Sequence, residues 1–317
     1  PADCITKLAP IDYDPNARLE MFEQFLGTIL PDAEVRSFVQ RSLGYCLTGL
    51  GTEEKMFFAY GPTATGKSSL LRGVITAMGD YAATADFGTF LQQDRTGRAT
   101  NDIARLAGKR LVTSIEVDEG QKMAEALVAQ ITGGDVVSAR FLYGESFEFV
   151  PTFKVWLAAN NRPRVRDDND ANWRRIVQIP FDQQIPEEDR DASIKAALAD
   201  ASVSGPAVLA WLVEGCLAWQ LVGLGTPDAV KAATTEYRES MNPLAEFLEE
   251  CCVFHHQARA ENPAIWQEYL DWAKTNNIRY PLGRKGFTQR LELVENVVFH
   301  RNGHGRFWEG VGLVKDV

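Results

Sequence analysis

One stretch decides the fold: Met56-Phe57-Phe58-Ala59-Tyr60, followed directly by Gly61-Pro62-Thr63-Ala64-Thr65-Gly66-Lys67-Ser68. The first five residues are apolar apart from the tyrosine hydroxyl, which predicts a short buried strand. The next eight match the pattern G-x-x-x-x-G-K-[ST] at every fixed position. Apolar residues then recur at helical spacing from Leu70 to Met78, and Gly79 is a good helix terminator. A strand, a glycine-containing loop and a helix in this order predict a phosphate-binding loop in an α/β fold.

The chemistry of this loop predicts ATP and Mg²⁺ as ligands. Glycines let the backbone point several N–H groups at phosphate oxygens, and the following helix adds its positive N-terminal end. Lys67 is expected to neutralise the β- and γ-phosphates, and Ser68 to offer its hydroxyl to Mg²⁺. The expected nucleotide-binding residues are Gly61, Pro62, Thr63, Ala64, Thr65, Gly66, Lys67, Ser68 and Ser69.

A carboxylate is expected at the end of a neighbouring parallel strand, where it would hold Mg²⁺ or polarise the attacking water. Residues 110–116 form an apolar strand pattern that ends in Glu116, and Asp118 and Glu119 follow. We expect Glu116 to serve the metal or the water, with Asp118 as an alternative metal ligand and Glu119 as an alternative catalytic acid. A solvated acidic turn is the competing interpretation, and the phosphate loop upstream favours the functional one.

Further elements follow along the chain. Residues 123–131 predict a helix, and the β-rich runs 136–142 and 147–149 around a Gly-containing turn predict a hairpin. A third buried strand, residues 153–159, ends at Asn160, whose amide could position the hydrolytic water. Two arginines, Arg174 and Arg175, then precede another apolar strand, and an arginine there can act on the site of a neighbouring subunit. Which arginine would do so stays open.

The order of these elements resembles superfamily III helicases, the AAA+ branch found in small viruses, phages and plasmids. The similarity is greatest to the phage and plasmid primase–helicase group with poxvirus-type helicase domains. The segments that carry it are Gly61–Ser69, Leu111–Gly120, Thr132–Phe149, Phe153–Pro163 and Trp173–Phe181.

This resemblance implies a homo-hexameric ring with ATP sites between subunits and single-stranded DNA in the central channel. It assigns Lys67 and Ser68 to phosphates and metal, Glu116 to the acidic strand, Asn160 to the sensor, and Arg175 or Arg174 to the arginine finger. It also implies that the hairpin reaches into the channel. Two hairpin residues are then candidate DNA contacts: Arg140 by charge and Tyr143 by stacking on a base.

We therefore expect an AAA+ P-loop core with a parallel sheet, flanked by helical segments. Residues 1–50 are expected to be a helical oligomerisation segment, 51–185 the superfamily III core, and 186–240 a helical segment packing on the core. Residues 241–317 are expected to form a winged-helix-like domain.

The expected C-terminal domain combines helices at 264–274 and 286–294 with strands at 297–300 and 306–308. A further amphipathic helix is expected at 251–256, and the Cys and His spacing matches no standard zinc finger. Three basic residues are candidate contacts to duplex DNA: Arg284, Lys285 and Arg301. A packing domain with solvated charges explains the same residues equally well.

Composition adds context. The net charge of −10 argues against a uniformly basic surface, although a ring can be acidic outside and basic in its pore. Five scattered cysteines indicate a reducing cytoplasm, and the resemblance adds a bacterial host cell. No apolar run looks long enough to span a bilayer, so no membrane segment is expected. The first residue is Pro1, and the resemblance implies a primase or polymerase domain upstream.

Two other functions fit the phosphate loop. A P-loop small-molecule kinase would need an acceptor pocket and a mobile lid, but neither the arginine finger nor the hairpin. An ATP-dependent origin initiator or loader would bind DNA without processive unwinding, and the sequence separates it poorly from a helicase.

Overall fold

The computed structural model describes residues 6–92, 99–115, 121–165, 170–241, 243–276, 278, 281–302 and 305–316. Contacts within the chain divide it into two compact units, Pro1–Tyr237 and Arg238–Val317. Each unit has its own hydrophobic core.

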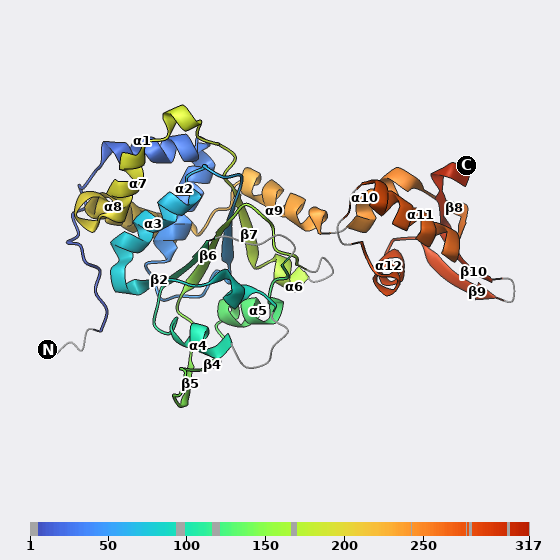
Figure 1. Cartoon of the computed structure of the whole chain (residues 1–317), viewed down its shortest axis with the longest axis horizontal. Helices are drawn as coiled ribbons and strands as arrows, with labels where there is room; N and C mark the ends of the chain where they lie inside the picture. Colours follow the sequence, from blue (N-terminus) through green and yellow to red (C-terminus); the bar gives the residue numbers. More distant parts are fainter. Residues whose placement is uncertain are drawn as a thin grey trace. The chain divides into compact units, whose positions relative to one another are not determined.

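A five-stranded parallel sheet forms the centre of the first unit (Figure 1). Its order is β2-β3-β6-β1-β7. The strand bounds are β1 Met56–Tyr60, β2 Ala82–Thr84, β3 Leu111–Ile115, β6 Lys154–Ala159 and β7 Ile176–Pro180. The four strands predicted from apolar runs are confirmed, because a parallel sheet covered on both faces buries nearly every side chain. The short edge strand β2 was not predicted.

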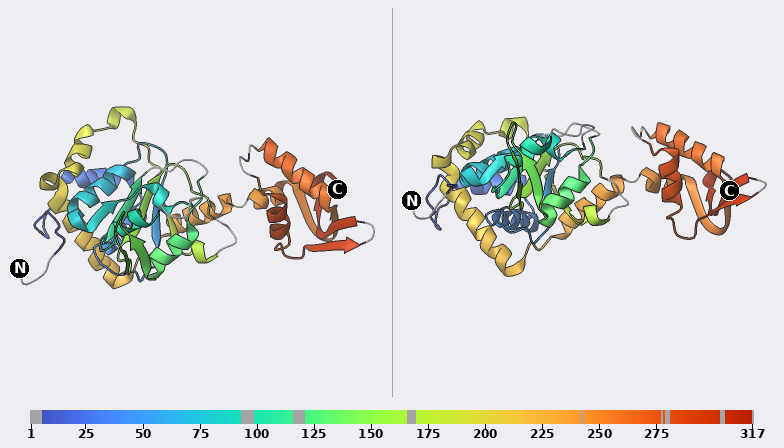
Figure 2. Two further views of the ribbon diagram at one scale, coloured as in Figure 1. Left: turned by 60° about the horizontal axis from the view of Figure 1, so that its bottom comes forward. Right: turned by 90° about the horizontal axis from the view of Figure 1, so that it is seen from below.

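Helices α1 (Glu20–Ile29), α2 (Ala33–Tyr45), α3 (Lys67–Met78), α7 (Ala192–Ala199) and α8 (Ala201–Val222) share one core with the sheet. Asp32 caps α2 by accepting hydrogen bonds from the N–H groups of Glu34 and Val35. Helix α8 packs closely on α2, where Gly44 and Gly215 let the backbones approach. Figures 1 and 2 show these helices grouped beside the sheet.

Helix α8 corrects one expectation. Among the described residues it is the one helix long and apolar enough, by length and composition, to cross a membrane. Its buried residues include Val208, Ala210 and Leu212, which pack in the core of the first unit. Core packing against α2 and α3 accounts for this composition without a membrane.

The predicted hairpin is present as β4 (Val137–Arg140) and β5 (Ser146–Phe149), paired antiparallel. Helix α5 (Glu125–Gly133) precedes it and begins two residues later than expected. Helix α4 (Ala99–Ala104) braces the hairpin, since Asn101 Oδ1 accepts a hydrogen bond from the N–H of Leu142 at 3.1 Å. In Figure 1 the hairpin projects beyond the sheet.

The remaining elements of the first unit are short, apart from the helix α9 (Asp228–Ser240), which lies beside β7 (Figure 1). They are the 3-10 turns Gly79–Tyr81, Phe87–Phe90 and Glu187–Asp189 and the helix α6 (Asp170–Trp173). Helix α9 is held on β7 by two hydrogen bonds of Gln178. The backbone N–H of Gln178 donates to Thr234 Oγ1, and the side-chain amide of Gln178 donates to the carbonyl of Ala233, both at 3.0 Å.

The second unit combines α10 (Pro243–Cys251), α11 (Asn262–Thr275) and α12 (Arg284–Leu291) with an antiparallel sheet of order β8-β10-β9. The strands are β8 (Cys252–Glu261), β9 (Val298–Asn302) and β10 (Gly305–Leu313), and the turn Val314–Asp316 follows. Helices on a sheet that ends in a hairpin agree with the winged-helix-like expectation. The helix expected at 251–256 is wrong: all but its first residue belong to β8, because Cys252, Val253 and Phe254 pair with β10.

Candidate nucleotide site

The predicted phosphate loop joins β1 to α3, and two of its glycines are required by the geometry. Gly66 caps α3 with φ +79°, and a Cβ there would lie 2.4 Å from Cγ2 of Ile29. A Cβ on Gly61 would lie 2.0 Å from the carbonyl oxygen of Phe181. Both distances are far below van der Waals contact, so the loop can run this close to its neighbours only with glycine at these positions.

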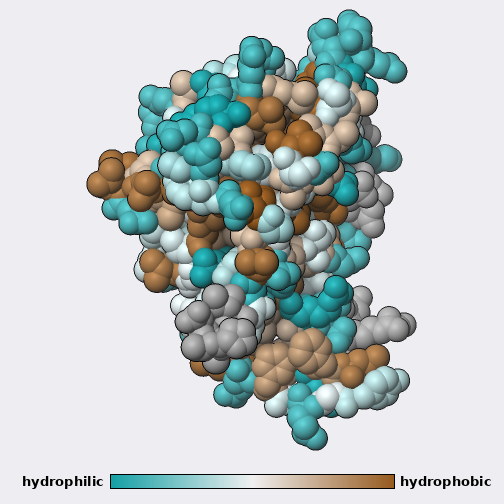
Figure 3. Space-filling view, turned by 90° about the vertical axis from the view of Figure 1, so that its left-hand side faces the viewer, coloured by the Kyte–Doolittle hydropathy of each residue, from teal (hydrophilic) through white to brown (hydrophobic). Residues whose placement is uncertain are grey.

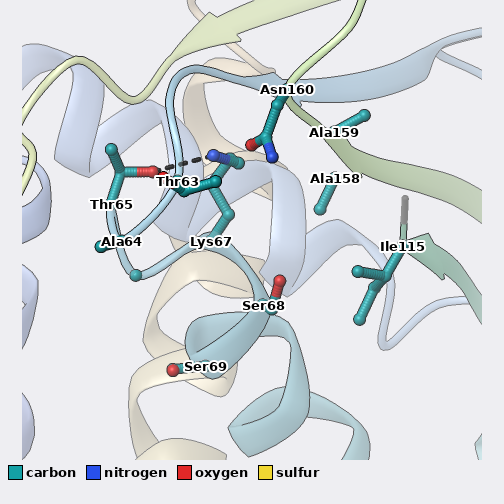
Figure 4. A pocket seen from close by; sticks show the side chains of 11 residues that line it. Thr63, Ala64, Thr65, Lys67, Ser68, Ser69, Ile115, Ala158, Ala159 and Asn160 are labelled. Atoms are coloured by element: carbon teal, nitrogen blue, oxygen red, sulfur yellow. Dashed lines mark hydrogen bonds between the residues drawn. The ribbon is translucent and has the colours of Figure 1, made fainter. Parts of the chain in front are cut away.

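The loop borders a cavity of about 290 Å³ at the carboxyl edge of the sheet (Figure 4). Its lining consists of Thr63, Ala64, Thr65, Gly66, Lys67, Ser68, Ser69, Ile115, Ala158, Ala159 and Asn160. Strand β6 lies between β1 and β3, so its end places Asn160 beside the loop. The N-terminus of α3 opens on the same space, and its partial positive charge favours a phosphate group there.

Lys67 is buried and holds the loop together from inside. Its Nζ donates hydrogen bonds to the carbonyls of Gly61 and Pro62 at 2.8 and 2.6 Å, and to Thr65 Oγ1 at 2.9 Å. Burial lowers the pKa of the ammonium group to about 8. Among the residues that the structure describes, no carboxylate contributes to this shift. An anionic phosphate would supply an opposite charge beside the ammonium group.

Of the predicted metal ligands, the structure describes Ser68. The exposed Ser68 lies in the first turn of α3, and Figure 4 shows its hydroxyl among the cavity-lining groups. This position fits a Mg²⁺ ligand beside the nucleotide phosphates. The predicted acids Glu116, Asp118 and Glu119 lie outside the described residues. Ile115, the residue directly before Glu116, ends β3 and lines the cavity.

Sequence reasoning missed the segment that supports the loop from outside. After β7, the N–H of Ile185 donates to the carbonyl of Ala64 at 2.9 Å, and the amide of Gln184 donates to the carbonyl of Thr63 at 3.2 Å. Residue Ala64 has φ +60°, a backbone conformation that costs energy without glycine, and the bond from Ile185 helps to hold it. These partners are about 120 residues apart in sequence, and no local pattern links them.

The two predicted finger arginines lie at the opposite end of the strands, near the amino ends of β1 and β7. They precede β7, and the carbonyl of Arg175 accepts a hydrogen bond from the N–H of Met56 at the start of β1, at 2.7 Å. The Arg175 side chain is 11% exposed, and that of Arg174 is 63% exposed. Glu54 Oε2 lies 3.8 Å from Arg174 and 3.7 Å from Arg175. The structure therefore does not bring either arginine to the cavity of the same chain.

The hairpin presents an apolar tip. Phe141, Leu142 and Tyr143 are 47%, 70% and 99% exposed, and Tyr143 has φ +63°. The rings of Phe141 and Phe147 stack with centroids 5.6 Å apart, which stiffens the base of the tip. Arg140, at the end of β4, is also exposed. Figure 3 shows apolar side chains at the end of the molecule where Figure 1 places this hairpin.

The predicted duplex contacts lie in the second unit. Arg284 and Lys285 are exposed in the first turn of α12, and Arg301 is exposed on β9. All three side chains are therefore accessible to a partner.

Two family models match the chain. The one described as "Family of unknown function (DUF5906)" matches residues 59–175, and the one described as "Poxvirus D5 protein-like" matches residues 239–309. The chain is 27% identical over 305 residues to "Putative helicase L207/L206" of Acanthamoeba polyphaga mimivirus, which covers 87% of this chain and 31% of that protein. It is 24% identical over 280 residues to "Putative helicase 022R" of Frog virus 3 (isolate Goorha), covering 82% and 29%. The chain thus spans about a third of the length of these curated relatives.

Among solved structures, the A form apo structure of "NrS-1 C terminal region-CTR" matches with a TM-score of 0.54 and 11% identity. The match covers 96% of this chain and 78% of that chain, and at this identity it concerns the fold. The parallel sheet and the phosphate loop define a P-loop protein with an AAA+-like core. The helicase-named relatives and the poxvirus D5 match make the class more specific. These matches support a helicase domain of the superfamily III primase–helicase type, to which this chain is similar.

Proposed function

We propose that this domain is an ATP-dependent DNA helicase that assembles as a hexameric ring and translocates on single-stranded DNA. ATP binds with Mg²⁺ in the cavity described above, where Lys67 contacts the phosphates and Ser68 the metal. Glu116, with Asp118 and Glu119 as alternatives, supplies the carboxylate, and Asn160 positions the hydrolytic water. The proposed setting is replication of phage or plasmid DNA in a bacterial cytoplasm, with a primase or polymerase domain upstream. This setting rests on the resemblance alone.

One observation supports the ring most strongly. The phosphate loop follows the carboxyl end of β1, whereas Arg174 lies near the amino end of the same strand. They are separated by the length of β1, five residues or about 16 Å. An arginine at that distance cannot stabilise charge on the γ-phosphate of its own subunit. In a closed ring with head-to-tail contacts, the same arginine faces the phosphate loop of the next subunit. We propose Arg174 rather than Arg175 as this finger, because its guanidinium is exposed.

The hairpin tip supplies the proposed contact to DNA. A nearly fully exposed tyrosine on a braced hairpin can stack on any base, which suits movement along a strand without sequence preference. Arg140 adds one positive charge for phosphate. The three basic residues of the second unit, Arg284, Lys285 and Arg301, are proposed to contact duplex DNA at a fork or origin.

Mixed assemblies test the shared site. Lys67→Ala removes the phosphate contact but leaves Arg174 in place, and Arg174→Ala does the reverse. Each variant alone is expected to hydrolyse ATP poorly. In an equimolar mixture, some sites combine the intact loop of one subunit with the intact arginine of its neighbour, so hydrolysis should recover in part. A mixture no more active than the two variants measured separately would contradict a finger shared between subunits.

A second measurement tests the motor itself. ATP hydrolysis by the wild-type domain should rise on addition of single-stranded DNA, and the mass in solution should rise with an ATP analogue and DNA. Unstimulated hydrolysis by a stable monomer would favour a small-molecule kinase instead. DNA-stimulated hydrolysis without unwinding of a forked duplex would favour an initiator or loader.

A further inference from the structure

Arg162 lies two residues beyond the sensor residue Asn160 and makes contacts that the sequence did not predict. Its side chain is 14% exposed. The guanidinium carbon lies 4.3 Å from the ring centroid of Tyr60. Its Nε donates a hydrogen bond to Gln178 Oε1 at 2.9 Å, and one terminal nitrogen donates to Glu236 Oε1 at 2.9 Å. One side chain, three residues beyond the end of β6, thus contacts the end of β1, the middle of β7 and the helix α9.

Each of these contacts bears on the nucleotide site. Tyr60 is the last residue of β1, and the phosphate loop begins at the next residue. The strand β6 leads directly into Asn160, so Arg162 belongs to the same short loop as the sensor. The guanidinium therefore links the start of the phosphate loop to the sensor loop at the carboxyl ends of β1 and β6.

Helix α9 holds this link from the other side. Tyr237 is fully buried, donates a hydrogen bond to the carbonyl of Pro163, and packs edge-on against Trp173. Its ring centroid also lies 5.5 Å from the guanidinium of Arg162. The sensor loop is thus fixed at two successive residues, Arg162 and Pro163, by the last turns of α9.

Burial makes this arrangement selective for arginine. A largely buried cation is costly unless its donors are satisfied, and a planar guanidinium can bond Gln178 and Glu236 while it stacks on Tyr60. Gln178 is 1% exposed, so loss of the arginine leaves a buried amide oxygen without that donor. The loop would then settle in another position rather than keep an empty space.

We propose that Arg162 is a positioning residue of the ATP site, which keeps the sensor loop and the phosphate loop in register and couples both to helix α9. The inference rests on the proposed ATPase function. Asn160 and Lys67 approach the γ-phosphate from two different loops, and Arg162 sets their separation. Binding of a nucleotide that moves either loop is transmitted through the guanidinium to α9.

The test compares Arg162→Gln with wild type in three measurements. Affinity for a non-hydrolysable ATP analogue is expected to stay within about threefold, whereas kcat falls about tenfold or more with KM little changed. Hydrogen exchange of residues 228–240 is measured with and without the analogue. Wild type should show a nucleotide-dependent change in α9, and the variant should lose it. Lys231→Ala is the matched control, because it removes an exposed ion pair with Asp228 on the same helix.

Results that overturn the role of Arg162 differ from the result that refutes the proposed function. Wild-type kcat in Arg162→Gln, or an unchanged exchange response in α9, would overturn the role of Arg162. Equal effects in Lys231→Ala would show that any damage to α9 suffices, which also overturns it. If Arg162→Gln does not fold, Arg162→Lys replaces it. Lysine keeps the charge and the aliphatic stem but cannot bond Gln178 and Glu236 at the same time. The same loss of kcat in this variant would support the role of Arg162, and wild-type kcat would overturn it. A wild type that hydrolyses no ATP would instead refute the proposed function.

Discussion

The ammonium group of Lys67 should make nucleotide affinity depend on pH in a predictable direction. Its pKa in the free protein is lowered to about 8 because the group is buried. A bound phosphate stabilises the charged form and raises the pKa again, so binding favours the protonated lysine. Affinity is therefore full well below pH 8 and falls as the pH rises through that value.

The size of the effect follows from the same pKa. At about pH 7.5 roughly a quarter of the free protein carries neutral Lys67, and at about pH 9 roughly nine-tenths does. If the bound lysine stays charged at both values, the dissociation constant rises about eightfold, or about 1.3 kcal/mol. This window lies above the titration range of histidine and of the terminal phosphate of ATP.

The assay is equilibrium binding of a fluorescent, non-hydrolysable ATP analogue with Mg²⁺ at the two pH values. Lys67→Arg is the control, because a guanidinium stays protonated throughout and should remove the pH dependence whatever its absolute affinity. A wild-type dissociation constant that is the same at both values would refute the reasoning. So would an equal loss of affinity in Lys67→Arg, since another group would then be titrating.

Three further predictions concern other parts of the domain. Gly66→Ala should lower nucleotide affinity at least about tenfold while far-UV circular dichroism is retained, because the new methyl group meets Ile29 in a left-handed backbone conformation. Arg174→Ala should reduce kcat about a thousandfold with little change in nucleotide affinity, and Arg174→Lys should have a kcat nearly as low. Equal losses in nucleotide binding and in turnover would argue against an arginine finger. Tyr143→Ala should abolish stimulation of ATP hydrolysis by single-stranded DNA without changing the basal rate, and Tyr143→Phe should preserve it, since stacking needs the ring and not the hydroxyl.

Much of the core could be predicted because buried parallel strands are continuous apolar runs. Residues 56–60, 111–115, 154–159 and 176–180 approach this pattern, since most of their side chains are apolar, and each proved to be a strand. The phosphate loop was predicted because its glycines and Lys67 are adjacent in sequence. The hairpin was predicted because β-rich runs flank a Gly-containing turn.

What could not be predicted depends on partners distant in sequence. Arg162 is separated from Glu236 by 74 residues, and nothing near it distinguishes it from a surface arginine. Gln184 likewise supports the phosphate loop from the segment after the neighbouring strand β7, 121 residues from its partner Thr63. The error at residues 251–256 has a related cause. A short stretch with mixed polarity fits a helix or an edge strand, and pairing with β10, about 60 residues later, decides for the strand.

The opposite placement of the phosphate loop and Arg174 has a consequence for how such a domain is switched on. If half of each catalytic site belongs to a neighbour, dilution alone stops turnover, without inhibitor and without unfolding. The rate per chain then climbs with the amount of chain present until the subunit contact saturates. Scarce copies stay idle and consume no ATP, so abundance itself acts as the control on the enzyme.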